Sequence, residues 1–162
     1  MSRVCYFASD APLKEKPNLF VKSYSINQAI AAGINLDMDI LDGIDRDEPD
    51  MVLCMESEEH GEFPAIFTSQ PYCEAPKSDK KYYADIGGSP CKDLSGIIEY
   101  IKDHMKKRKE ENTEELELWY IWLGSDESEI IYKECSIKEL TEDYLEEFFT
   151  DDENDYKIII TR

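Results

Sequence analysis

The turn that links a predicted strand to the longest predicted helix has the residue types of an anion site. It contains Gly87, Gly88, Ser89, Cys91 and Lys92. Glycines let a backbone approach a ligand closely, N–H groups at a helix start attract anions, and a lysine adds positive charge. The spacing matches neither G-x-x-x-x-G-K-[ST] nor G-x-G-x-x-G. The turn is therefore a candidate phosphate or carboxylate site, with an ordinary chain reversal as the alternative.

Cys91 in this turn is also a candidate nucleophile. A thiol at the start of a helix, next to a lysine, can have a lowered pKa. Nucleophilic catalysis also needs a general base, and the chain contains only two histidines, His60 and His104. His104 lies about three turns along the same predicted helix, roughly 18 Å from its start, which leaves only His60. We therefore predict no catalytic residue and interpret Cys91 as a turn cysteine.

The cysteines and acidic residues do not form a recognisable metal site. Five cysteines are widely spaced, without a C-x-x-C pair, at positions Cys5, Cys54, Cys73, Cys91 and Cys135. Residues 37–48 place acids where a calcium loop needs them, but Leu41 and Asp42 occupy its fifth and sixth positions, where a ligand and a glycine are required. No metal or cofactor is predicted. The odd number of cysteines and an amino-terminal apolar run too short for a signal peptide favour a reducing compartment, the cytoplasm.

The chain is strongly acidic, and this bears on its partners. It has 37 Asp and Glu against 18 Lys and Arg, a net charge of -19. Between residues 110 and 155 there are eighteen acids and only two bases, Lys133 and Lys138. Such a charge repels phosphate backbones and anionic lipids, so we expect neither free nucleic acid nor a membrane as a partner. A basic protein or a cation is the better expectation, and a solubilising acidic coat is the alternative.

Residues 116–123 are predicted to form the strand that organises the fold, because both of its alternating faces are apolar from Leu118 onward. This pattern is typical of a strand that is buried on two sides, so the strand is predicted to lie in the middle of a sheet. Further strands are predicted over residues 3–8, 51–55, 65–68, 82–86, 130–135 and 156–160. We expect residues 65–68 to pair with 51–55, and 130–135 to form an antiparallel hairpin with the central strand.

Helices are predicted after Ser25 and Ser136, each with capping-box spacing to Gln28 and Glu139, and over residues 93–109. One or two helical turns are expected within residues 37–48, and a turn-rich loop over 69–81. Strands and helices do not alternate regularly, which predicts an α+β fold: a mostly antiparallel mixed sheet with two or three helices packed on it. At 162 residues, we expect residues 1–162 to form one domain.

Aromatic side chains near the central strand complete the functional prediction. Trp119, Trp122 and Tyr132 are either core residues or part of an aromatic patch rimmed by carboxylates. We favour an acidic soluble interaction protein, inhibitor-like or immunity-like, that binds a basic protein and is not an enzyme. The alternatives are a small enzyme or anion-binding domain that uses the Gly87–Lys92 turn, and a structural subunit that forms a homodimer.

Overall fold

The computed structural model describes residues 3–37, 43–72, 78–106 and 114–162. They divide into two compact units. The larger unit consists of Met1–Pro17 with Phe63–Arg162, and the smaller one of Asn18–Glu62. The prediction that these form one domain stays a prediction.

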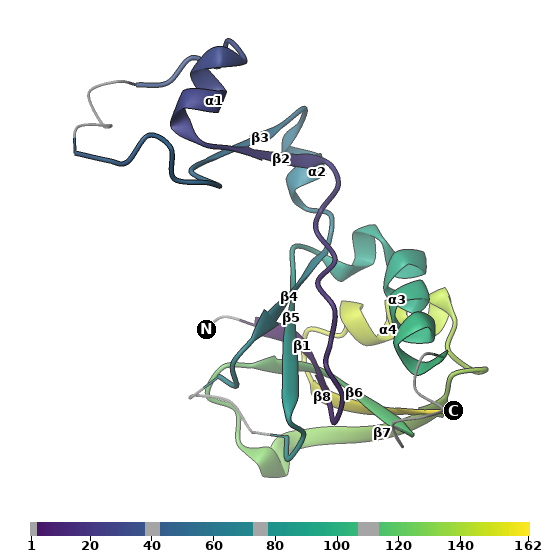
Figure 1. Ribbon diagram of the computed structural model, residues 1–162. Helices are drawn as coiled ribbons and strands as arrows, with labels where there is room; N and C mark the ends of the chain where they lie inside the picture. The colour runs from purple at the N-terminus through teal and green to yellow at the C-terminus, as the bar shows by residue number, and fades with distance from the viewer. Residues whose placement is uncertain (1–2, 38–42, 73–77, 107–113) are drawn as a thin grey trace. The chain divides into compact units, whose positions relative to one another are not determined.

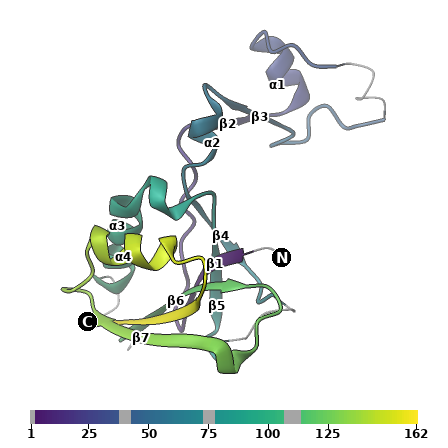
Figure 2. The same ribbon diagram turned by 180° about the vertical axis from the view of Figure 1, so that it is seen from behind.

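A six-stranded sheet forms the frame of the larger unit (Figure 1), in the order β4-β5-β1-β6-β8-β7. Its strands are β1 (Arg3–Ser9), β4 (Ala65–Ser69), β5 (Tyr82–Gly87), β6 (Glu115–Trp122), β7 (Ile130–Ser136) and β8 (Asp155–Thr161). All neighbouring strands are antiparallel except β7 and β8. Helices α3 (Leu94–Lys106) and α4 (Glu142–Thr150) cover one face (Figure 2). The predicted α+β class and mixed sheet are confirmed.

Strand β6 lies in the middle of this sheet, between β1 and β8, as its two apolar faces predict. Leu116 and Leu118 are fully buried in the core beneath the helices. Trp119 and Ile121 are buried on the opposite face, in a second cluster with Tyr6. Residues on alternate sides of one strand therefore belong to two separate apolar clusters.

Helix α3 buries the stripe that its periodicity predicts. Ile97, Ile98, Ile101 and Met105 are buried against the sheet, at helical spacing. Asp93 caps the helix, because its Oδ1 atom accepts a hydrogen bond from the Gly96 amide at 3.0 Å. The helix is described to Lys106, and the rest of the predicted range, residues 107–109, lies outside the described residues.

The predicted antiparallel hairpin of β6 and β7 is wrong. Strand β8 lies between them, antiparallel to β6 and parallel to β7, so that Ile158 is opposite both Leu118 and Lys133. Seven residues separate β6 from β7, more than a tight hairpin turn needs. The apolar Ile158–Ile160 run of β8 is buried best between two strands, and α4 provides the crossover that a parallel pair requires.

The predicted pairing of residues 51–55 with 65–68 is also wrong. Strand β4 pairs with β5, in register Ile66 to Ile86, and belongs to the large sheet. Strand β3 (Val52–Met55) pairs instead with β2 (Val21–Tyr24) in the smaller unit. Ala65 and Ile66 are buried in the larger unit, so the pairing with β5 encloses apolar surface that a local hairpin would leave exposed.

The third helix begins later than its capping-box spacing predicts. Ser136 still belongs to β7, and the Ile137 amide continues the ladder by donating to the Thr161 carbonyl at 2.7 Å. Glu139 accepts hydrogen bonds from Ser136, but this contact closes a turn. Helix α4 starts at Glu142, where Thr141 is the N-cap. Pairing of Ser136 with β8 therefore prevents the helix from starting at the predicted cap.

In the smaller unit, the two-stranded β2–β3 ribbon is accompanied by α1 (Ile26–Ala31) and α2 (Glu58–Gly61). The predicted capping box at Ser25 and Gln28 is confirmed, with both reciprocal hydrogen bonds present. Within residues 37–48, the described positions contain turns and no helix, and residues 38–42 lie outside the description.

Candidate functional site

The glycines of the predicted anion-binding turn are required by the fold itself. Gly87 ends β5, and a Cβ atom there would lie 2.7 Å from the Phe67 ring. Gly88 has a φ of 76°, which suits glycine because it has no Cβ atom. The chain then makes one 3-10 turn, Pro90–Lys92, before α3. A packing contact and a turn therefore account for both glycines.

The amino terminus of α3 already holds a carboxylate of the chain itself. Asp93 accepts the Gly96 N–H, and its other oxygen pairs with Lys16 at 3.3 Å. The side chain of Ser89 makes no capping hydrogen bond. An external anion would have to compete with Asp93 for the positive end of the helix. The structure therefore brings Gly87, Ser89 and Lys92 together in one turn without adding support for a ligand there.

Cys91 does not have the environment of an activated thiol. Desolvation and the nearby Glu146 carboxylate raise its pKa, whereas a nucleophilic cysteine needs a lowered one. His104 is buried, and its Nε2 atom lies 3.0 Å from the Ser9 hydroxyl. His60 belongs to the smaller unit, where it stacks on Phe20. None of these contacts brings a general base to Cys91.

The Ser9–His104 pair resembles a nucleophile and its base only in distance. Ser9 is fully buried, and its hydroxyl oxygen accepts a hydrogen bond from the Ala11 amide at 3.2 Å. A nucleophile must reach its substrate. We therefore interpret the pair as a structural tie between the end of β1 and α3.

The three aromatic residues that were predicted to bind a partner differ in how far their side chains are exposed. Trp119 is 1% exposed, stacked on Tyr6, and its indole donates to Glu117. Trp122 is half-buried beside the Arg3 guanidinium and lines a shallow hollow with carboxylates. Tyr132 is 51% exposed at the β7 edge of the sheet. Only Trp122 and Tyr132 can therefore present surface to a partner.

The largest concentration of exposed apolar side chains lies in the smaller unit, where sequence reasoning did not place it. Ten large apolar side chains are classed as exposed within the part of the chain that the structure describes, and six of them belong to residues 18–62. These six define what we call the 18–62 surface: Leu19, Phe20, Ile30, Met51, Leu53 and Met55. Exposed apolar residues are common singly, but six among 45 residues is a higher density than the described part of the larger unit has.

Strand geometry aligns three of these side chains. Leu53 and Met55 are two residues apart in β3 and so point to the same side of the ribbon, and Met51 continues this spacing. They are 62%, 44% and 40% exposed, respectively. The intervening Val52 and Cys54 are only half-buried, so the alternation of the strand did not reveal which side would face solvent.

A hollow of about 310 Å³ lies in the same unit. Phe20 and His60 stack in its wall, with their ring centroids 4.7 Å apart. Apolar and polar side chains complete the lining: Leu19, Lys22, Tyr24, Ala32, Ile34, Cys54, Met55 and Glu56. The hollow thus shares Leu19, Phe20 and Met55 with the 18–62 surface and gives it a concave part, which suits an inserted side chain.

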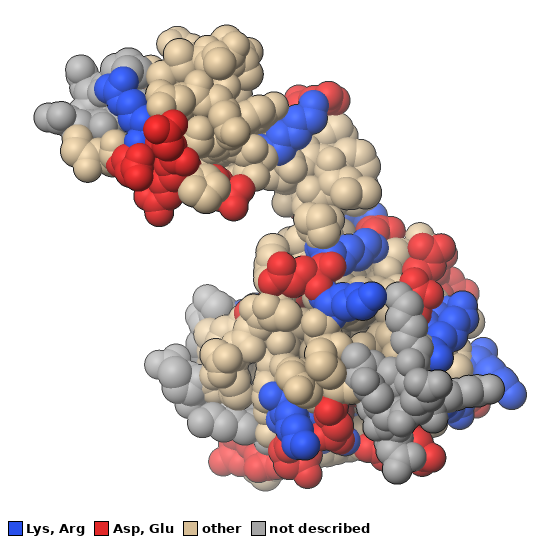
Figure 3. Space-filling view, viewed as in Figure 1, with Lys and Arg blue, Asp and Glu red and all other residues tan. Residues whose placement is uncertain are grey.

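The unit that carries this apolar surface is acidic. Residues 18–62 contain eleven Asp and Glu against Lys22 and Arg46, a net charge of -9. Asp50, Glu56 and Glu58 are exposed next to the ribbon or directly after it in the chain. Figure 3 shows, on this unit, a continuous area without charged side chains that has both acidic and basic side chains at its edge. The smaller unit therefore combines exposed apolar side chains with an excess of acidic ones.

Comparison of the chain with protein-family models, curated proteins and solved structures gives no match. Within the described residues, no helix has both the length and the apolar character to cross a bilayer. The same residues include no group of three or more His, Cys, Asp or Glu side chains that could hold a metal ion.

Proposed function

We propose that this chain is an acidic interaction protein whose 18–62 surface binds a basic protein partner. The observation that carries the proposal is the coincidence, in one unit, of six exposed large apolar side chains with a net charge of -9. This surface replaces the Trp119 region as the main contact area, because Trp119 is enclosed by its own unit.

The residue types support this role. Phe and Met are enriched in the cores of protein interfaces, and methionine adapts its shape to different partners. The row formed by Met51, Leu53 and Met55 would supply contact area, and the hollow beside Phe20 would accept one anchoring side chain. Burial of such a surface in the complex would slow its dissociation.

The charge supports the choice of a basic partner. A negative surface accelerates encounter with a positive one and disfavours acidic competitors. The partner would therefore combine lysine or arginine residues with an apolar patch. The described cysteines, Cys5, Cys54, Cys91 and Cys135, are free thiols, which supports a partner in the cytoplasm.

The proposal is tested by recovering partners of the full chain at low salt and identifying those with an excess of basic residues. Leu53→Ser should remove most of the recovered partner, since it places a hydroxyl in the centre of the apolar row. Tyr132→Ser tests the alternative contact area on the sheet, and Ile131→Ser on the same strand is the matched control. Loss of the partner with Tyr132→Ser but not with Leu53→Ser would place the interface on the larger unit and contradict the proposal.

A further inference from the structure

Strand β3 forms one edge of a small, incomplete sheet in the smaller unit (Figure 1). Its one strand neighbour among the described residues is β2. Two strands alone are marginally stable in water, and a third strand that buries an apolar face stabilises such a ribbon. We propose that the basic partner adds an extended segment to β3, with apolar side chains in its middle and lysine or arginine at both ends. This inference rests on the proposed function and specifies how the partner binds.

The outer edge of β3 carries backbone groups that can pair with an added strand. Opposite residues in an antiparallel pair alternate between hydrogen-bonded and non-hydrogen-bonded pairs, so half of the N–H and C=O groups point away from the neighbouring strand. The β2–β3 register, with Ser23 opposite Leu53, therefore directs such groups to the outer edge. Within the described part of the chain, Val52–Met55 make no backbone–backbone hydrogen bond beyond this pairing. Groups of this kind are what an extended peptide pairs with in strand addition.

Strand β3 lacks the features by which proteins usually protect an edge strand, which are lysine, proline and β-bulges. Residues 51–55 contain no charged residue and no proline. The residues of β3 pair one to one with those of β2, without a bulge. Strand β2, in contrast, carries the exposed Lys22, which would repel a basic segment. We therefore expect the added strand beside β3 and not beside β2.

The exposed apolar side chains of this strand define the middle of the added segment. Met51, Leu53 and Met55 alternate along the chain and are exposed on one side of the ribbon. Side chains of adjacent strands pack against each other when they lie on the same face of the sheet. An added segment with an apolar side chain at every second position would therefore cover this row while its backbone pairs with β3.

Carboxylates flank β3 at both ends. Glu48 and Asp50 precede the strand, Glu56 and Glu58 follow it, and all four side chains are exposed. None of them belongs to an ion pair within the residues that the structure describes. A segment with a lysine or arginine at each end would place a positive charge beside both groups. These charges therefore favour a segment that is basic at its ends and apolar between them.

The same carboxylates disfavour a second copy of this chain as the added strand. An antiparallel pairing of two β3 strands places the start of each strand beside the end of the other. Residues 48–50 of one copy would then lie beside residues 56–58 of the other, and their acidic side chains would repel each other. A parallel pairing would bring identical carboxylates together. The added strand therefore belongs to a different chain.

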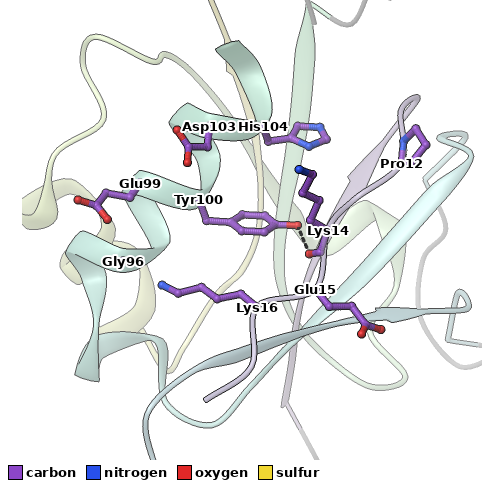
Figure 4. A pocket seen from close by; sticks show the side chains of 9 residues that line it. All are labelled: Pro12, Lys14, Glu15, Lys16, Gly96, Glu99, Tyr100, Asp103 and His104. Carbon is purple, nitrogen blue, oxygen red and sulfur yellow. Dashed lines mark hydrogen bonds between the residues drawn. The ribbon is translucent and has the colours of Figure 1, made fainter. Parts of the chain in front are cut away.

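The larger unit contains a pocket of about 270 Å³ between α3 and the segment that follows β1 (Figure 4), but its charges do not select a ligand. The Lys16 ammonium is already paired with Asp93 at 3.3 Å, and the Tyr100 hydroxyl donates to the Lys14 carbonyl at 2.8 Å. Acidic and basic side chains both line this pocket. The edge of β3 is therefore the better-supported binding site.

The test is calorimetric titration of the full chain with the synthetic peptide acetyl-Lys-Val-Thr-Val-Thr-Val-Lys-amide. The matched control peptide has glutamate in place of both lysines. We expect saturable binding of the lysine peptide with a dissociation constant below about 1 mM, and at least about tenfold weaker binding of the glutamate peptide, which meets like charges at both ends. Glu56→Lys should weaken binding of the lysine peptide by at least about threefold, whereas Glu134→Lys, at an exposed position on β7, should leave it unchanged.

N-methylated forms of the lysine peptide test the backbone pairing itself. In an added strand, alternate N–H groups point toward β3 and the others point to solvent. One peptide is therefore N-methylated at its second and fourth residues, and another at its third and fifth. One of the two should bind at least about tenfold more weakly than the parent peptide, and the other about as tightly. Equal effects of the two methylation patterns would overturn the proposal.

Hydrogen exchange locates the added strand. Backbone amides of β3 should exchange more slowly when the lysine peptide is bound, while those of β7, an edge strand of the large sheet, should not change. Slower exchange in β7 but not in β3, or no saturable binding of the lysine peptide, would overturn the proposal. The proposed function is judged separately, on the recovered partner. A partner that is lost with Leu53→Ser, while no peptide adds to β3, would bind the 18–62 surface without strand addition.

Discussion

The Trp119 indole nitrogen donates a hydrogen bond of 2.8 Å to the Glu117 carboxylate, two residues earlier on the same face of β6. Glu117 is 3% exposed and also pairs with Lys157 at 2.8 Å, while the Lys157 ammonium lies 4.7 Å from the centre of the Trp119 ring. A buried carboxylate is thus satisfied from two directions in the middle of the sheet. The central strand depends on a polar contact as well as on its apolar side chains.

Glu117→Ala is expected to destabilise the fold by about 3 kcal/mol, because it leaves a lysine and an indole N–H without their buried partner. Glu115→Ala is the matched control, on the same face of the same strand. Its side chain is 48% exposed and pairs with Lys80 at 3.3 Å, so its loss should cost no more than about 1 kcal/mol. Urea unfolding of both variants measures the difference, and equal costs would show that the buried contact contributes nothing special.

Gly96→Ala should destabilise the chain, although alanine is usually better than glycine inside a helix by about 1 kcal/mol. A Cβ atom at this position would lie 2.0 Å from the Asp93 carboxylate that caps α3. Moving that carboxylate loses both the cap and its ion pair with Lys16, which together should cost about 2 kcal/mol in unfolding free energy, more than the gain in helix propensity. Lys102→Ala, on the same helix and away from the cap, is the control. A Gly96→Ala variant with raised thermal stability would refute the role assigned to Asp93.

Asp151 should contribute to the acid sensitivity of the protein. The Tyr156 hydroxyl, the Asn154 amide and the Glu153 backbone N–H donate to its carboxylate and hold its pKa well below its usual range. A lowered pKa gives stability that is present above the unfolded value of about 4 and is lost as the pH falls toward the folded value.

Asp151→Asn should therefore make the loss of stability below about pH 4 less steep, by up to about one proton. Tyr156→Phe should reproduce part of this change, since Tyr156 is the main donor. Urea unfolding measured at a series of acidic pH values gives the slope. An unchanged slope in both variants would mean that Asp151 is not held in this way.

Unfolding of the full chain should be cooperative, as the prediction of one domain requires. Among the described side chains of residues 18–62, the buried apolar ones are Ile26 and Ala29, too few for an independent core. Both tryptophans lie in the larger unit, so their fluorescence follows that unit while far-ultraviolet circular dichroism follows both. The two transitions should coincide. A separate, earlier dichroism change would show that the smaller unit unfolds independently.

Local signals in the sequence predicted part of the local structure: the Ser25–Gln28 spacing starts a helix, whereas the same spacing at Ser136 and Glu139 does not, because Ser136 pairs in β7. The Ser25–Gln28 capping box could be predicted because a helix cap involves residues that are close in sequence. The central position of β6 could be predicted because apolar residues occupy both of its alternating faces. Pairing partners were not predictable in the same way. Strand β8 lies between β6 and β7 because this position buries its isoleucines between two strands that are distant in sequence. The local sequence of β8 does not show which distant strands will be its neighbours.

In the candidate sites, too, the sequence predicted the local element but not which of its side chains are exposed. The sequence identified residues 51–55 as a strand but could not show that Met51, Leu53 and Met55 would face solvent, since an apolar strand usually indicates a core. Trp119 was an open choice between core and interface, and the structure places it in the core.

The central claim, that charge and apolar surface act together in binding a basic partner, is tested most directly by the salt dependence of affinity for the recovered partner. Raising salt from about 0.1 M to about 1 M shortens the Debye length from about 10 Å to about 3 Å. We predict that the wild-type dissociation constant rises at least tenfold over this range. The Leu53→Ser variant should bind more weakly at both salt concentrations, with a similar salt dependence. An affinity that does not change with salt, or a Leu53→Ser variant that binds as tightly as the wild type, would contradict the account.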